Sequence, residues 1–76
     1  MKFRTNATSP DSYLAVRNKI QEAFPNANLE FHLEVTDGVM HINGIPENTV
    51  HAAQIENAIK EAGFTGSWLT REEENR

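Results

Sequence analysis

The stretch from residue 29 to residue 45 reads LEFHLEV-TDG-VMHINGI and constrains the fold more than any other part of the chain. Apolar and polar residues alternate along LEFHLEV, which is typical of a strand with one buried face. Asp37-Gly38 is a favoured pair for a two-residue type I′ turn. We therefore predict a β-hairpin with Leu33 and Ile42 on its buried face and His32 and His41 on its polar face.

The two-residue turn also predicts which residues face each other across the hairpin. A slip of one residue would bury His41 and expose Ile42, so the turn and the apolar pattern favour the same register. The predicted pairs are Thr36 with Val39, Val35 with Met40, Glu34 with His41, Leu33 with Ile42, His32 with Asn43 and Phe31 with Gly44.

Composition narrows the class of protein. The chain has 76 residues, which corresponds to one small domain, and 38% of them are apolar, as in globular proteins. Its net charge of −4 argues against nucleic-acid binding, and the absence of cysteine excludes disulfides and thiolate sites. No apolar run is long enough to span a membrane, and MKFRTN at the start lacks a signal-peptide core. We therefore expect a cytoplasmic protein that does not insert into a membrane.

A short strand and a helix are predicted before the hairpin. Residues 2–7 (KFRTNA) alternate, with Phe3 as the main apolar residue directed to the core. Ser9 is a good N-cap and Pro10 suits the first position of a helix that ends before Pro25. The inner residues expected for these two elements are Phe3, Thr5, Ala7, Tyr13, Val16, Ile20 and Ala23 or Phe24.

A second helix and a last strand are predicted after the hairpin. Asn48 or Thr49 would cap the helix, and Gly63 would end it in the left-handed conformation. Residues 64–70 (FTGSWLT) form the last strand, which completes a domain of residues 1–70, and residues 71–76 (REEENR) are expected to be a disordered acidic tail. The inner stripe expected for the helix is Val50, Ile55, Ala58, Ile59 and Ala62.

The order strand-helix-strand-strand-helix-strand predicts an α+β fold. With right-handed crossovers it gives the ferredoxin-like βαββαβ arrangement, a four-stranded antiparallel sheet with two helices on one face. The second and fourth strands would lie at the edges of the sheet. Its other face would be open to water or to a partner.

Residues 2–69 resemble the heavy-metal-associated (HMA) domain family. The resemblance lies in the lengths of the elements, in Val16 and Ile20 of the first helix, and in AIKEAGF at residues 58–64. The family binds soft metal ions through an M-x-C-x-x-C loop, and by this resemblance Ser9 and Ser12 stand at its two cysteine positions. A hydroxyl does not replace a thiolate as a ligand for copper(I). The resemblance thus implies a degenerate member with the fold, a connection to metal homeostasis or transport, and no metal at Ser9 and Ser12.

Other polar residues are candidate ligands or catalysts. His32, Glu34 and His41 share the polar face of the hairpin and are an alternative zinc or copper(II) site, but two solvated histidines are the preferred explanation because no fourth ligand is evident. Ser9 and Ser12 have no histidine nearby in the predicted topology, so we expect no catalytic residue, no enzymatic activity and no cofactor.

The sequence therefore favours a non-catalytic module that binds a protein partner or a second copy of itself. Trp68 belongs to the core unless Leu69 points inward, in which case Trp68 would be exposed on the sheet. A further alternative is a surface- or lipid-associated module, because residues 37–64 also resemble the BON domain at Gly38, Met40, Ile42 and Gly44. The predicted interaction surface is Glu30, His32, Glu34, His41, Asn43 and Trp68.

Overall fold

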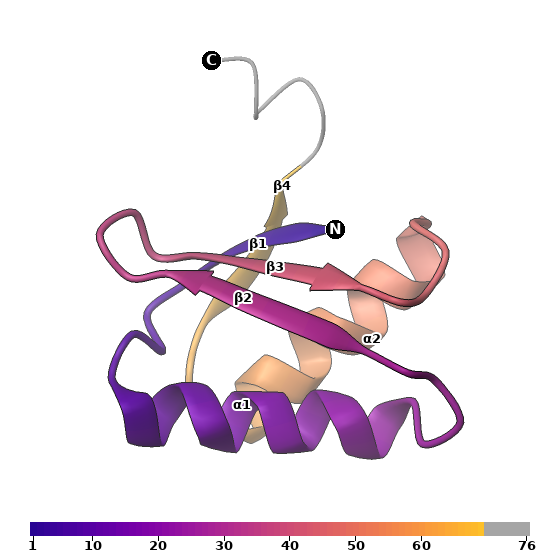
Figure 1. Ribbon diagram of the computed structural model, residues 1–76, viewed down its shortest axis with the longest axis horizontal. Coiled ribbons are helices and arrows are strands. Elements are labelled where there is room, and N and C mark those ends of the chain that lie inside the picture. The colour runs from indigo at the N-terminus through magenta and orange to yellow at the C-terminus, as the bar shows by residue number, and fades with distance from the viewer. Residues whose placement is uncertain (70–76) are drawn as a thin grey trace.

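The computed structural model describes residues 1–69 and has the predicted order of elements. Its sheet is antiparallel with the strand order β2-β3-β1-β4, so β2 and β4 are the edges, and both helices lie on one side of it (Figure 1). This confirms the ferredoxin-like fold. The predictions for Thr70 and for the tail at 71–76 lie outside the described residues. The elements are β1 (Lys2–Thr5), α1 (Pro10–Ala23), β2 (Glu30–Glu34), β3 (Val39–Asn43), α2 (Thr49–Glu61) and β4 (Gly66–Leu69).

The predicted hairpin register is wrong by two residues. Glu34 faces Val39 and His32 faces His41, so the connecting loop has four residues rather than two. Asp37 does not have a positive φ, whereas Gly38 has a φ of 66°, which excludes the type I′ turn. A shift of two residues keeps every side chain on its predicted face, because strands alternate with a period of two.

A contact with β1 explains the longer loop. The carbonyl oxygen of Gly38 accepts the N–H of Thr5 at 2.7 Å, and the N–H of Gly38 donates to the carbonyl of Glu34 at 2.9 Å. A Cβ atom at position 38 would lie 2.9 Å from the carbonyl oxygen of Thr5. The glycine therefore serves the approach of the loop to β1, in addition to the turn itself.

Capping residues set the limits of both helices as predicted. Ser9 caps α1 and Pro10 is its first residue, while Asn48 caps α2 by accepting the N–H of His51 at 2.7 Å. Gly63 follows α2 with a φ of 95°. One residue of the predicted inner stripe is wrong, because Val50 is 66% exposed.

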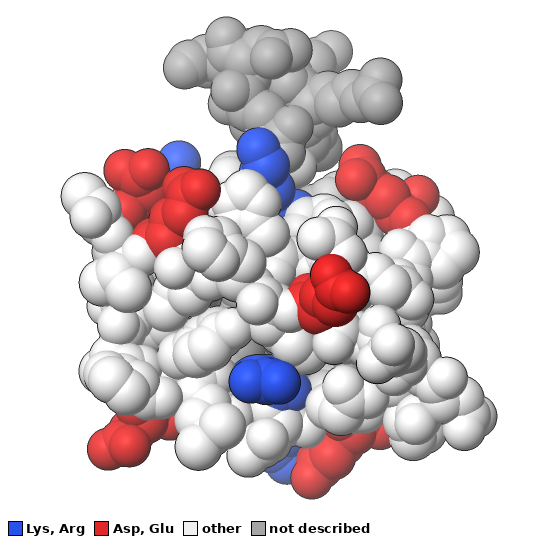
Figure 2. Space-filling model, in the orientation of Figure 1, with Lys and Arg blue, Asp and Glu red and all other residues white. Residues whose placement is uncertain are grey.

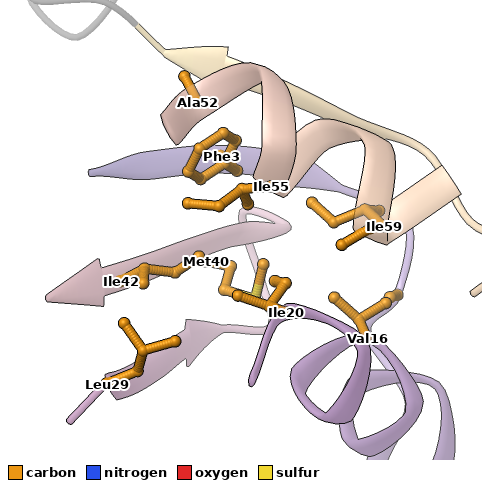
Figure 3. Close-up of a cluster of buried hydrophobic side chains, with 11 residues drawn as sticks. Phe3, Val16, Ile20, Leu29, Met40, Ile42, Ala52, Ile55 and Ile59 are labelled. Atoms are coloured by element: carbon orange, nitrogen blue, oxygen red, sulfur yellow. The ribbon is translucent and has the colours of Figure 1, made fainter. Parts of the chain in front are cut away.

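The core lies between the helices and the sheet, where side chains from β1, β3, α1 and α2 point toward one another (Figure 3). Met40 is fully buried there, and Ala52 takes the inner position that Val50 was expected to fill. β1 is shorter than predicted, although Ala7 beyond its end is also buried. β4 begins at Gly66 rather than at residue 64. The largest fully buried side chains are Phe3, Val16, Ile20, Met40, Ile42, Ile55 and Ile59.

The fold also bears on the BON alternative and on the expectation that the chain does not insert into a membrane. β1 pairs with both β3 and β4, so residues 2–5 form a central strand, and the BON alternative, which does not call for this strand, loses support. Neither helix within residues 1–69 is long and apolar enough to cross a membrane.

Candidate functional site

The two edges of the sheet differ in how their backbone groups are covered. At the β4 edge, the N–H of Trp68 points away from β1 and donates to Oε2 of Glu56 in α2 at 3.0 Å. The helix also packs closely on this strand, since a Cβ at Gly66 would lie 2.4 Å from Cδ1 of Ile59. A carboxylate of α2 therefore satisfies the outward N–H of Trp68, and the helix packs against the strand at Gly66.

In the part of the chain that the structure describes, the β2 edge has no comparable hydrogen bond. Ile42 exchanges backbone hydrogen bonds of 2.7 Å with Met1, so its polar groups point toward β1. Successive residues of a strand direct their backbone groups to opposite sides. The N–H and C=O groups of His41 therefore point toward β2 and hydrogen-bond its partner His32. The N–H and C=O groups of Phe31 and Leu33 must then point outward. Within residues 1–69, no side chain hydrogen-bonds them.

A groove of about 530 Å³ runs beside this uncovered edge, between β2 and the start of α1. Tyr13, Phe31 and Leu33 are half-buried in it, and Val35 in the hairpin loop is 60% exposed. The guanidinium of Arg17 lies 5.3 Å from the centre of the Phe31 ring, which is a cation–π contact. The groove is lined by Thr8, Ser9, Pro10, Tyr13, Phe31, His32, Leu33 and Val35.

The outer face of the hairpin is polar and acidic. Glu30, His32 and Glu34 of β2 are exposed. Figure 2 shows a mostly uncharged surface with acidic side chains toward its corners, and with an acidic and a basic side chain nearer its middle. Glu30 faces Asn43, which corrects the predicted pairing of Asn43 with His32. Five residues of the predicted interaction surface therefore share this face, namely Glu30, His32, Glu34, His41 and Asn43.

Trp68, the sixth residue of that predicted surface, lies elsewhere. It pairs with Phe3 of β1, which is in the core, so its side chain is on the helix side of the sheet. There it is half-buried against the core, and it does not extend the polar face.

Three of these polar residues lie close together. Nε2 of His41 lies 3.4 Å from Oε1 of Glu34. The ring centres of His32 and His41 are 5.8 Å apart, and the ring planes make an angle of 72°. The predicted register, which set His41 directly opposite Glu34, is replaced by a direct His32–His41 pair. Within residues 1–69, no group of three His, Cys, Asp or Glu side chains stands ready to hold a metal ion.

The two serines ahead of α1 bond each other and the helix backbone. Their Oγ atoms are 2.7 Å apart, the N–H of Ser9 donates to Ser12 Oγ at 3.0 Å, and the N–H of Ser12 donates to Ser9 Oγ at 3.2 Å. This is a complete capping box in which serine takes the place of the usual acid or amide. Two hydroxyl oxygens do not form a site for copper(I), which prefers sulfur ligands.

Some positioned residues were not found from the sequence. His51 is half-buried, with Nδ1 2.7 Å from the carbonyl oxygen of Pro46 and its ring edge-on to Phe24 at 5.5 Å. The spacing of Asn48 and His51, three residues apart at a helix start, is the signal for this arrangement. The role of Glu56 has no local signal, because its partner Trp68 is twelve residues away.

Comparison with known proteins identifies a structural neighbour. No protein-family model matches the chain, and no curated protein does. Among solved structures, its fold is similar to that of a mutant of the copper chaperone Atx1 from Synechocystis PCC6803 in a trimeric form, with a TM-score of 0.67. The two are 16% identical over 88% of this chain and 98% of the Atx1 chain, so this chain shares the fold of a copper chaperone, as the HMA resemblance implied.

Proposed function

We propose that this protein is a non-catalytic interaction module of HMA-like fold that binds an extended segment of a partner protein along β2. The observation that carries the proposal is the difference between the two sheet edges. The outward backbone groups of Phe31 and Leu33 are uncovered, whereas Glu56 covers Trp68 at the opposite edge. An added strand would supply main-chain hydrogen bonds to β2.

The surroundings of β2 indicate the chemistry of the partner. Side chains of an added strand alternate between the two faces of the sheet. One set would enter the apolar groove beside Tyr13 and Leu33, and the other would lie next to Glu30 and Glu34 on the outer face. The partner segment therefore alternates apolar and basic residues.

The same charges favour a different protein over a second copy. The fullest antiparallel pairing of two β2 strands is centred on His32 and sets Glu30 opposite Glu34 at both ends of the pair. Like charges that face each other across a sheet destabilise it. Glutamates on an edge strand are also a common protection against unwanted self-pairing.

The fold supports a cytoplasmic role connected with metal homeostasis or transport, because the structural neighbour is a copper chaperone. Transfer of copper(I) by the loop ahead of α1 is not part of the proposal. By the HMA resemblance Ser9 and Ser12 occupy the cysteine positions, and their hydroxyls already hydrogen-bond within the helix cap. Nucleophilic catalysis is not proposed either, since no base hydrogen-bonds the hydroxyl of Ser9 or Ser12 within residues 1–69.

Two labelled peptides test the proposal by fluorescence anisotropy in the presence of a metal chelator. One alternates valine and lysine, and the other alternates valine and glutamate. We expect the protein to bind the lysine peptide more tightly, because Glu30 and Glu34 attract its basic set. The variant E30K/E34K should reverse this preference.

The variant E22K/E47K is the matched control, because it changes the net charge equally at exposed positions outside the groove. It should keep the preference for the lysine peptide. If both variants lost the preference for the lysine peptide to the same extent, the preference would depend on net charge alone, and the proposal would be overturned. Absence of saturable binding by either peptide would also overturn it.

A further inference from the structure

We propose that a pocket between α2 and the start of β4 binds a small carboxylic acid with an apolar body. The pocket lies at the sheet edge opposite β2, so the inference is independent of the proposed function. Its volume of about 390 Å³ is within the range of small-molecule sites in proteins. Its lining includes Ala53, Glu56, Lys60, Phe64, Thr65 and Gly66.

The backbone of Gly66 offers an unused donor at this edge. Trp68 donates its N–H to Glu56, so the backbone groups of Trp68 point away from β1. Gly66 lies two residues earlier in the same strand, and backbone directions alternate along a strand, so its N–H also points away from β1. Within residues 1–69, no group accepts this N–H. A ligand oxygen in the pocket would accept it, as Oε2 of Glu56 accepts the N–H of Trp68.

Lys60 gives the pocket a positive charge on the side of the helix. Its side chain is exposed in the last turn of α2, and among the described residues it forms no ion pair. Of the described residues that line the pocket, Glu56 carries the one carboxylate, and this group already accepts the N–H of Trp68. An ammonium group and a backbone N–H that line one pocket from two elements favour a carboxylate, because hydrogen bonds to an ionised acceptor are stronger than neutral ones.

Apolar side chains provide a surface for the body of the ligand. Phe64 is half-buried, and it packs against the core and also lines the pocket. Ala53 is an exposed residue of α2 that lines the pocket from the helix. The hydroxyl of Thr65 makes no hydrogen bond within residues 1–69 and is a further donor beside Gly66. An aromatic acid suits this combination, because its ring would pack against Phe64 and its carboxylate suits the donors.

NMR titration of the full chain with phenylacetate tests the inference. We expect saturable shifts of the backbone amide signals of Thr65 and Gly66, and no shift of those of Phe31 and Leu33 in β2. Phenylacetamide has nearly the same shape without the charge. It should bind about tenfold more weakly, because it loses the charged interaction with Lys60.

Variants of Lys60 locate the charge that the ligand uses. Lys60→Met keeps an apolar stem and removes the charge, so it should weaken phenylacetate binding about tenfold, whereas Lys60→Arg should retain binding. Lys19→Met is the matched control, because it removes the same charge from an exposed lysine of α1 that does not line this pocket. It should bind phenylacetate as tightly as the original protein.

Four results would overturn the inference. They are an absence of saturable shifts at Thr65 and Gly66, equal affinity for phenylacetamide, unchanged affinity in Lys60→Met, and equal weakening by Lys60→Met and Lys19→Met. None of them would affect the peptide experiment, which reports on binding at β2.

Discussion

Glu56, in the middle of α2, accepts the backbone N–H of Trp68 in β4 through a hydrogen bond of 3.0 Å. This bond satisfies an outward-pointing donor of an edge strand, which would otherwise be available to another chain. Within the described residues, 1–69, the opposite edge, β2, has no such bond at Phe31 or Leu33. The two edges therefore differ, because α2 satisfies an outward donor of β4, whereas the outward groups of Phe31 and Leu33 lie beside an apolar groove.

Replacing Glu56 with alanine should expose the β4 edge. We expect a loss of about 1 kcal/mol in the free energy of unfolding, because a partly buried N–H loses a charged acceptor. The variant should also self-associate at high concentration. Urea denaturation and analytical ultracentrifugation measure the two effects. Glu56→Gln keeps an acceptor and should lose less than half as much stability, so an equal loss in both variants would contradict this role.

Val35 should contribute to peptide binding without contributing to stability. It lines the groove and is 60% exposed, so Val35→Ser should change the free energy of unfolding by less than about 0.5 kcal/mol. The same change should weaken binding of the valine–lysine peptide about fivefold, since it removes about 1 kcal/mol of apolar burial. Val50 is 66% exposed on α2 and does not line the groove. Val50→Ser is therefore the control, and an equal effect on affinity would argue against the groove.

Ser9 should matter for the stability of α1. Ser9→Ala removes the side-chain acceptor for the N–H of Ser12 and should lower the free energy of unfolding by about 1 kcal/mol. Ser9→Asp keeps an acceptor and places a negative charge at the positive end of the helix, so it should retain the stability. Thermal denaturation followed by circular dichroism compares the two variants. Equal melting temperatures for Ser9→Ala and the original protein would show that the cap contributes nothing.

Gly66 should be required for the packing of α2 on β4. An added Cβ would lie 2.4 Å from Cδ1 and 3.1 Å from Cγ2 of Ile59, so the helix or the isoleucine must move. We expect Gly66→Ala to lower the free energy of unfolding by about 1–3 kcal/mol. The neighbouring Ser67 is exposed, and Ser67→Ala should have an effect below about 0.5 kcal/mol. Chemical denaturation of both variants checks the difference.

The fold could be predicted from the sequence because local signals agreed with each other. Ser9, Pro10 and Asn48 set the helix starts, and the alternation in LEFHLEV identified the faces of β2. Few strand orders satisfy the connection rules once the elements are known, which gave the correct sheet topology.

The errors arose where contacts between distant residues decide the structure. The hairpin loop is longer than Asp37-Gly38 suggested because Gly38 bonds Thr5 of β1. Val50 is exposed because it is out of phase with the stripe that passes through Ala52 and Ile55. An apolar residue near a helix start thus does not report which face is inward.

The candidate site was predictable in part. The sequence predicts that His32, Glu34 and His41 share one polar face. This prediction is correct despite the error in register, because side chains alternate along a strand and a shift of two residues keeps each on the same face. It did not give the direct His32–His41 pair, which depends on the loop length. It also did not reveal the difference between the two edges, since that depends on the contact of Glu56 with Trp68 across the fold.

Hydrogen–deuterium exchange of the backbone amides, with and without the valine–lysine peptide, tests the use of the β2 edge most directly. With peptide at ten times its Kd, exchange at Phe31 and Leu33 should slow about tenfold, because a paired strand protects the outward N–H groups. The amide of Trp68, which Glu56 already covers, should exchange at the same rate in both samples. Unchanged exchange at Phe31 and Leu33 in the saturated protein, or protection that appears at β4 instead, would contradict the proposed mode of binding.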